Sequence, residues 1–213
     1  MSVVVVTAGV GNRALAESLG AEVVDGGSTM NPATADLVAA IDRANAAEVV
    51  VLPNNGNVIM SAEQAAEHAT KVARVVPTRS IQAGLATLVS FDPTLSADEN
   101  AAAMQETLAS VVTGAVTIAS RDVQLNGVAV KAGKWLGLAE GEAVAGGETF
   151  DEAAEAVLET LLREPRGVLT LLAGEAAPAL DGLVEHVREA YPDLELDVHD
   201  GGQPHYPLLL AAE

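Results

Sequence analysis

The first hundred residues alternate between strand-like and helix-like segments, and this alternation restricts the possible folds more than any other feature. The run Ser2–Thr7 is rich in β-branched residues and ends at glycines, which is typical of a buried strand. Segment 34–45 instead places Leu37, Val38 and Ile41 on one helical face. Repeated strand–helix–strand units of about 30 residues are how parallel strands are connected. We therefore predict a parallel sheet with helices on both faces.

Further elements of this first half follow from local signals. Gly20 ends a short helix, and Pro77 ends a strand. We expect a helix at 12–19, strands at 22–24, 48–52 and 72–76, and a helix capped by Ser61 with Gln64 at the capping-box position.

The second half has a different order of elements, because strands follow one another in pairs. Asn126-Gly127 is a strong hairpin signal between expected strands 115–124 and 127–134, and a glycine-rich loop is expected at 141–147. The other expected elements are helices 96–111, 150–163 and 178–190, and strands 168–172, 194–199 and 207–212. This pattern predicts an α+β domain with a mixed or antiparallel sheet. We place the boundary between residues 92 and 98, which gives domains 1–95 and 96–213.

Composition excludes several classes of function. The chain has 213 residues, with 30 acidic and 11 basic side chains, a net charge of −19 and no cysteine. This charge disfavours nucleic acid and anionic membranes as partners, and the lack of cysteine excludes thiolate nucleophiles and cysteine-bound zinc. No apolar run approaches the ~18 residues that span a bilayer, so we expect a cytoplasmic protein without membrane insertion.

Much of the negative charge lies on two expected helices. Residues 101–213 hold 19 acidic and six basic side chains. Two readings stay open: a solvated helix face, or an acidic docking face for a basic partner. The acidic positions are Asp151, Glu152, Glu155 and Glu159 on one helix and Asp181, Glu185 and Glu189 on the other.

The loop at 26–32 is the most informative polar stretch. It follows a strand and precedes a helix, and its two glycines permit close approach of a ligand to the backbone. Ser28, Thr29 and Asn31 add side-chain hydrogen-bonding groups beside a helix N-terminus. This chemistry suits a carboxylate, a phosphate or an acidic loop of a partner. The alternative is an elaborate helix cap formed by Asn31 or Thr34.

Two further polar loops follow the next strands. Asn54, Asn55 and Asn57 come after one strand, and Thr78 and Arg79 come after the next. Ligands of open parallel sheets bind at the carboxyl ends of the strands, so we expect these loops to share one edge. Asparagines also favour left-handed turn conformations, which is the structural alternative.

Near the C-terminus, Gln203, His205 and Tyr206 lie in the loop before the last strand. His205 and Tyr206 form either an acid–base pair or an anchored turn. Arg121 is expected within a strand, where Arg121 and Asp122 point to opposite faces and one of them reaches inward. The histidines lack metal-ligand spacing, so no metal site is expected, and no residue is assigned a catalytic role.

Four separated motifs together resemble one family. They read Gly-Gly-Ser-Thr-Met-Asn-Pro at 26–32, Leu-Pro-Asn-Asn-Gly-Asn at 52–57, Val-Val-Pro-Thr-Arg-Ser at 75–80 and Gly-Gly-Gln-Pro-His-Tyr at 201–206. Arg121-Asp122 and the segment 131–138 lie between them. The chain resembles the C-terminal domain of the A-type, ATP-binding subunit of fatty acid kinase. This DhaL-related family is also labelled dihydroxyacetone kinase-like or "Dak phosphatase".

The resemblance implies a DegV-like α/β fold, with an N-terminal parallel α/β (Rossmann-like) subdomain, a C-terminal α+β subdomain and a cleft between them. In this family a separate DhaL domain binds ATP and magnesium, and a DegV-type carrier protein presents the fatty acid that becomes acyl phosphate. The C-terminal domain is thought to engage that carrier. The resemblance therefore implies a DegV-type fatty-acid-binding protein as partner and no cofactor in this chain.

The sequence departs from the whole kinase subunit, because nothing in it resembles the aspartate-rich magnesium loop of the kinase domain. We expect a piece of a longer protein or a stand-alone accessory domain, inactive as a kinase by itself. Turnover of ATP by the isolated chain with magnesium and fatty acid would contradict this expectation.

Other functions stay open beside docking. A DegV-type lipid-binding module would use Ser28 and Thr29 around a fatty-acid carboxylate, although the histidine and Gly-Pro-Gly ending of the carriers is replaced here by residues 201–206. An independent hydrolase would use Thr29, Asn54, Arg79 and His205, yet no set of nucleophile, base and orienting group can be named. A homodimer also stays open.

Overall fold

The computed structural model describes residues 1–125 and 127–213, which form two compact units, Met1–Val111 and Val112–Glu213. The division falls later in the chain than the boundary expected between residues 92 and 98. The reason is helix α5 (Ala97–Ser110), which packs on β3 and β4 of the first unit. The Glu48 carboxylate accepts a hydrogen bond from the Ala97 N–H at 2.7 Å, and Arg74 pairs with Asp98 at 2.5 Å.

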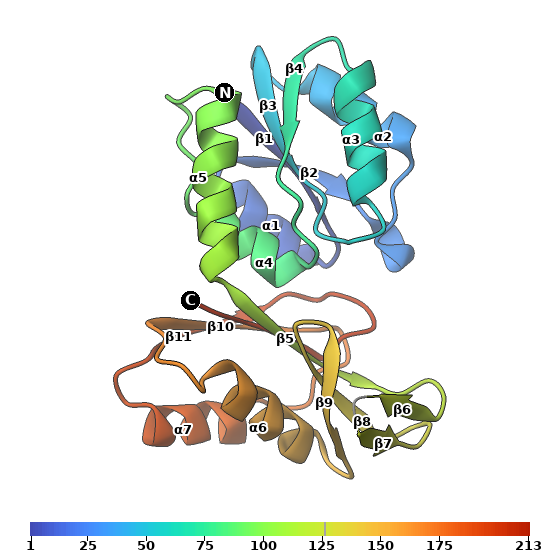
Figure 1. The fold of residues 1–213 in the computed structure, drawn as a ribbon, viewed down its shortest axis with the longest axis vertical. Coiled ribbons are helices and arrows are strands. Elements are labelled where there is room, and N and C mark those ends of the chain that lie inside the picture. Colours follow the sequence, from blue (N-terminus) through green and yellow to red (C-terminus); the bar gives the residue numbers. More distant parts are fainter. Residues whose placement is uncertain (126) are drawn as a thin grey trace. The chain divides into compact units, whose positions relative to one another are not determined.

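The first unit contains a sheet of four parallel strands in the order β2-β1-β3-β4 (Figure 1), which confirms the predicted parallel sheet. The strands are β1 (Ser2–Thr7), β2 (Ala21–Asp25), β3 (Glu48–Leu52) and β4 (Val72–Val75). The helices are α1 (Val10–Ser18), the short 3₁₀ helix η1 (Gly27–Thr29), α2 (Thr34–Arg43), α3 (Ile59–His68), α4 (Ile81–Leu88) and α5.

Both faces of this sheet are covered by helices, as Figure 1 shows. Val4 and Val6 of β1 belong to a buried cluster with Leu37 of α2 and Ala62 of α3. The intervening valines of β1 point to the opposite face, where α1, α4 and α5 lie, and they are also fully buried. Burial on both faces explains why β1 is an uninterrupted apolar run rather than an alternating one.

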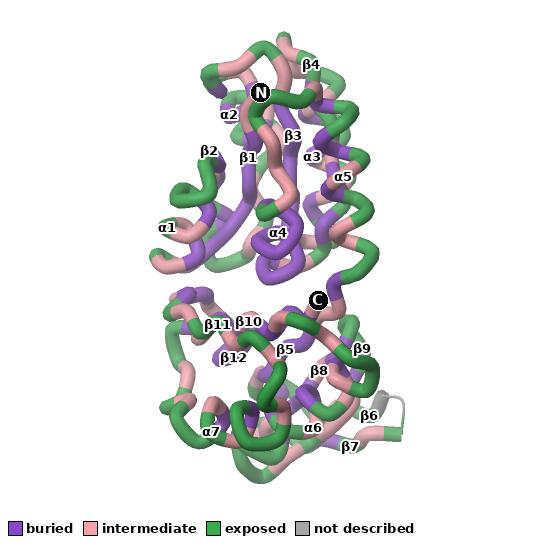
Figure 2. The backbone as a smooth tube through the Cα atoms, turned by 90° about the vertical axis from the view of Figure 1, so that its left-hand side faces the viewer, coloured by how far each residue is buried: buried purple, intermediate pink, exposed green. Residues whose placement is uncertain are grey.

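Two helices of this unit differ from the prediction. Helix α3 begins at Ile59 after Val58, so Ser61 lies inside the first turn and is not the cap. Helix α4 was not predicted at all. All eight of its residues are buried, as the purple trace in Figure 2 shows, so it lacks the polar face by which helices are recognised in a sequence. Ser80 caps α4 by accepting a hydrogen bond from the Ala83 N–H.

The second unit is built on a six-stranded sheet in the order β11-β10-β12-β5-β8-β9. Only the β10–β11 pair of this sheet is parallel, so the sheet is mixed, as predicted. Its strands are β5 (Val112–Ile118), β8 (Trp135–Ala139), β9 (Glu142–Gly147), β10 (Val168–Ala173), β11 (Glu195–Asp200) and β12 (Leu208–Ala212). A separate hairpin joins β6 (Val123–Leu125) to β7 (Val128–Val130).

Helices α6 (Phe150–Leu161) and α7 (Asp181–Ala190) pack on this sheet through their apolar sides. Ala153, Val157 and Leu158 of α6 and Leu183 and Val187 of α7 are buried in the same cluster. The acidic side chains noted in the sequence all lie on the exposed sides of these helices. The apolar sides therefore hold the helices to the sheet, and the charges face solvent.

Strand assignments around the hairpin needed correction. The predicted strand 115–124 is two separate strands, β5 and β6, and the expected loop 141–147 is mostly strand β9. Glycines of β9 serve close packing rather than turning: a Cβ on Gly146 would lie 2.4 Å from Val130 Cγ2. The Asn126-Gly127 turn falls partly on residue 126, outside the described residues.

The cap of α5 gives a first testable prediction. Ser96 accepts a hydrogen bond from the Glu99 N–H, and the Ser96 N–H and hydroxyl donate to the Glu99 carboxylate at 2.9 and 2.6 Å. Ser96→Ala should lower the free energy of unfolding by about 1 kcal/mol at neutral pH. Urea unfolding measures the difference.

The same cap should make that difference depend on pH. The hydrogen bonds from Ser96, first from its hydroxyl and then from its N–H, hold the pKa of Glu99 below its ordinary value. A lowered carboxyl pKa contributes stability above the unfolded-state pKa, and this is lost as pH falls through the folded-state value. The gap between wild type and Ser96→Ala should therefore narrow below about pH 4. An equal gap at pH 7 and pH 3 would contradict the assignment.

Candidate functional site

The carboxyl edge of the parallel sheet brings together the three polar loops that the sequence pointed to. The Asn55 side-chain amide donates to the Met30 carbonyl at 2.8 Å, which joins the loop after β3 to the loop after β2. The Asn54 N–H donates to the Thr78 hydroxyl at 3.0 Å, which joins it to the loop after β4. The predicted shared edge is therefore confirmed, because loops 26–32, 53–57 and 77–80 are in direct contact.

Asn54 and Thr78 form the buried support of this edge. Asn54 adopts a left-handed conformation, with φ of 52°, and is only 2% exposed. Its side-chain amide donates to the Val6 carbonyl at 3.0 Å, which ties the loop to the end of β1. Thr78 is fully buried. The turn role that the sequence left open for the asparagines therefore applies to Asn54, and both side chains position the loops instead of facing solvent.

Five predicted side chains lie exposed around this support: Ser28, Thr29, Asn31, Asn57 and Arg79. The β2 loop is stabilised by the Gly27 N–H, which donates to the Asp25 carboxylate at 2.8 Å. The cap of α2 is Ala33, whose N–H donates to the Asp36 carboxylate at 3.2 Å, and this replaces the predicted caps Asn31 and Thr34.

The electrostatics of the edge favour an anionic group. Helices α2, α3 and α4 begin directly after these loops, so their N-terminal N–H groups lie at this edge. Arg79 adds a cation, and a Cβ built on Gly56 would lie 3.8 Å from its Nη1. The exposed hydroxyl and amide groups supply neutral hydrogen bonds. Together these groups can hold a carboxylate, a phosphate or an acidic loop of a partner.

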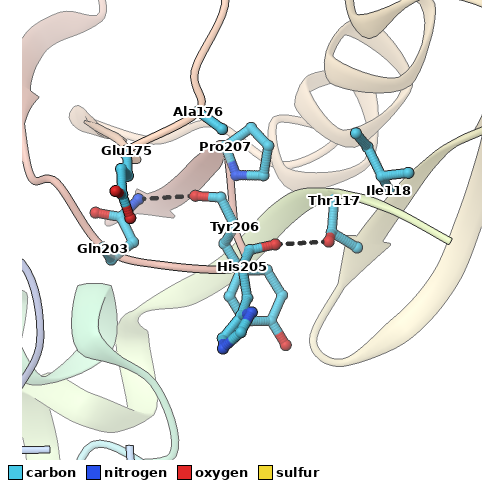
Figure 3. A pocket seen from close by; sticks show the side chains of 8 residues that line it. All are labelled: Thr117, Ile118, Glu175, Ala176, Gln203, His205, Tyr206 and Pro207. Carbon is cyan, nitrogen blue, oxygen red and sulfur yellow. Dashed lines mark hydrogen bonds between the residues drawn. The ribbon is translucent and has the colours of Figure 1, made fainter. Parts of the chain in front are cut away.

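The other predicted residues belong to the second unit, where a pocket of about 410 Å³ lies at the loop before β12 (Figure 3). Gln203, His205 and Tyr206 line it, as the sequence suggested they would act together. The remaining lining residues are Thr117, Ile118, Glu175, Ala176 and Pro207.

The pocket loop is tightly anchored. Gln203 is 1% exposed, and its Nε2 donates to the Leu172 carbonyl at 2.9 Å and to the Tyr206 carbonyl at 3.1 Å. The Thr117 hydroxyl donates to the His205 carbonyl at 2.8 Å (Figure 3), and His205 has a φ of 68°. These bonds support the anchored-turn reading of His205 and Tyr206, and both residues remain exposed.

Arg121 differs from its prediction. It lies in a bend between β5 and β6, outside any strand, is exposed, and is not among the residues that line the pocket. Asp122 instead accepts hydrogen bonds from Lys131 Nζ at 2.8 Å and from the Ala132 N–H at 3.0 Å. The bond from Lys131 is the main reason that the pKa of Asp122 is lowered, and it raises the pKa of Lys131. This pair closes the base of the hairpin.

Sequence reasoning missed half of the pocket. Antiparallel pairing places the end of β5 beside the start of β12, with Val116 opposite Leu208, and so brings Thr117 and Ile118 next to Pro207. Glu175 and Ala176 follow β10, the other neighbour of β12. Finding them required the strand order, for which the sequence has no local signal.

Within the described residues, no group of three or more histidine, aspartate or glutamate side chains is arranged to hold a metal ion. None of the helices in that part of the chain is both long and apolar enough to cross a bilayer.

The fold is shared with solved DegV proteins. The fatty-acid-binding DegV family protein from Thermus thermophilus superposes with a TM-score of 0.67 at 16% identity, over 100% of this chain and 99% of that one. The fatty acid kinase (Fak) B3 protein of Streptococcus pneumoniae, loaded with linoleic acid, gives 0.65 at 11% identity with the same coverage. At these identities the likeness establishes the DegV-like fold alone, and it confirms the predicted fold class.

A curated relative shows clearer sequence similarity. An uncharacterized protein of Staphylococcus haemolyticus is 38% identical over the whole chain, which spans 39% of that protein's length. A family model for the C-terminal region of FakA-like proteins, the A-type subunits of fatty acid kinase, matches residues 2–213. The chain therefore belongs to the FakA-like family of fatty acid kinase subunits and corresponds to the C-terminal part of such proteins.

Proposed function

We propose that this chain is the non-catalytic accessory domain of the ATP-binding subunit of a fatty acid kinase, and that it docks a DegV-type fatty-acid carrier. The proposal rests on its membership of the C-terminal family over residues 2–213. The chain spans about two fifths of its curated relative. We assign binding of ATP and magnesium, and formation of acyl phosphate, to the rest of such a kinase subunit.

The geometry supports docking because the polar loops are fixed before any partner arrives. Buried Asn54 and Thr78 hold the carboxyl edge of the parallel sheet, and exposed Arg79, Asn57 and Thr29 stand on that support. Rigid loops lose little conformational entropy on binding. Charged and polar groups on such a surface contribute specificity and association rate more than raw affinity.

Arg79→Ala tests this edge. The variant should bind a fatty-acid-loaded DegV-type carrier about three- to tenfold more weakly than wild type, mainly through slower association. Arg43→Ala is the matched control, because Arg43 is exposed in the last turn of α2, away from the carboxyl edge where that helix begins. Stopped-flow or biolayer measurements give both rates. Equal affinity for the two variants would remove the edge from the docking surface.

A second candidate is a lipid-binding module, favoured by the fold shared with the fatty-acid-binding Thermus protein. Exposed Ser28 and Thr29 beside the start of α2 would then hold the fatty-acid carboxylate. Native mass spectrometry of the purified chain separates the two functions. A retained fatty acid supports this second candidate, and the bare chain mass together with carrier binding supports docking.

A further inference from the structure

The pocket of the second unit combines apolar walls with a single carboxylate. Ile118, Ala176 and Pro207 provide the apolar surface, and Glu175 is the one acidic residue among the lining residues (Figure 3). Glu175 is exposed and takes part in none of the ion pairs within residues 1–125 and 127–213. A volume of about 410 Å³ is in the range of sites that enclose a ligand group.

Several donors around the pocket are already directed at the protein backbone. Both hydrogen bonds that Gln203 Nε2 donates end on carbonyl groups, and the Thr117 hydroxyl donates to the His205 carbonyl. The Thr117 oxygen can still accept a hydrogen bond, as can both oxygens of Glu175. The side chains therefore offer strong acceptors and the aromatic ring of Tyr206, which suits a ligand group rich in donors.

The charge of the surrounding unit points the same way. Residues 112–213 carry 18 acidic and six basic side chains, a difference of 12. A negative field of this kind attracts cations and repels anions. The group that enters the pocket should accordingly be positively charged.

The pocket is also built to a fixed shape. A Cβ on Gly174 would lie 2.1 Å from the Tyr206 carbonyl oxygen, so only glycine allows the turn after β10 to approach the loop before β12 this closely. The Glu175 N–H donates to the Gln203 carbonyl at 3.0 Å. His205 is held in the left-handed region, which is costly for a residue other than glycine and is concentrated at functional sites.

We infer that this pocket receives the guanidinium group of an arginine from the docked carrier. The inference rests on the proposed docking function and names a contact within it. A guanidinium presents its donors in a planar fork that matches the Glu175 carboxylate, and it stacks on aromatic rings such as that of Tyr206. The aliphatic stem of the arginine would lie on Ile118 and Pro207.

Carrier titration with charge-neutral variants tests the inference. Glu175→Gln should weaken binding about tenfold, because it removes the charge while keeping the shape. Glu185→Gln, on the exposed side of α7, removes the same charge outside the pocket and should change affinity by less than about twofold. Circular dichroism confirms that both variants are folded. Equal affinities of the two variants would overturn the inference and leave docking intact.

Two further arms identify the group that binds. Tyr206→Phe should bind like wild type and Tyr206→Ala more weakly, because the ring and not the hydroxyl carries the stacking. Butanedione modification of carrier arginines should erase the difference between wild type and Glu175→Gln, whereas acetylation of its lysines should preserve it. Survival of the difference after arginine modification would overturn the arginine assignment. Failure of the wild-type chain to bind any loaded, folded carrier would overturn docking, and the inference with it.

Discussion

Replacing Gly84 with alanine is expected to lower the free energy of unfolding by about 3 kcal/mol. A Cβ on Gly84 would lie 1.9 Å from Asn54 Oδ1 and 2.4 Å from its Cγ. Asn54 cannot move aside cheaply, because its amide is bonded to the Val6 carbonyl and its N–H to Thr78. The added methyl group must therefore displace helix α4 or break these bonds. Urea denaturation followed by circular dichroism measures the loss.

The control for this prediction is Gly182→Ala. Gly182 lies in α7, and no atom is within 4 Å of the position that its Cβ would occupy. Alanine is the better helix former, so this variant should gain up to about 1 kcal/mol. In the double variant Asn54→Gly, Gly84→Ala, glycine accepts the left-handed conformation and removes the clash, so the two changes should not be additive. A Gly84→Ala protein as stable as wild type would show that α4 does not pack on Asn54.

Replacing Gly174 with alanine is expected to lower the free energy of unfolding by about 3 kcal/mol and to abolish specific binding at the pocket. Here the obstacle is backbone: the Cβ would lie 2.1 Å from the Tyr206 oxygen and 2.9 Å from the Gln203 oxygen. Backbone atoms cannot rotate away as a flexible side chain can. The loop before β12 must shift, and the His205 and Tyr206 side chains shift with it. Thermal or urea unfolding measures the stability, and carrier titration measures the binding.

Gly167 provides the matched control because it lies at the other end of the same strand, just before β10. The atom nearest to its Cβ position is the Glu213 oxygen at 3.7 Å, an ordinary contact. Gly167→Ala should therefore change the stability by less than about 0.5 kcal/mol. If the two alanine variants unfold alike, the close approach at Gly174 does not hold the pocket loop.

The parallel sheet and its polar edge could be predicted because their signals are local. Each strand and the loop after it are contiguous in the sequence, and parallel strands necessarily collect those loops at one edge. Thr29, Asn54 and Arg79 were therefore brought together without knowledge of the strand order. The same reasoning could not separate the buried Asn54 from the exposed Arg79, because burial depends on packing by distant segments such as α4.

The second unit was predicted less completely because its structure depends on non-local pairing. The pocket needs β12 between β10 and β5, and only that order brings Glu175 and Thr117 to the loop of His205. The glycines of β9 gave a loop signal, although they serve close packing on Val130. Local composition therefore misidentified a strand whose glycines are required by its tertiary contacts.

Docking is tested most directly by a calorimetric titration of this chain with a DegV-type carrier, loaded with fatty acid and empty, at low and at high salt. Docking predicts saturable binding with a defined stoichiometry that weakens as salt increases, because exposed charges such as Arg79 and Glu175 contribute to it. No binding of either form of a folded carrier, together with a fatty acid retained by the chain in native mass spectrometry, would contradict the docking function and establish a lipid-binding one.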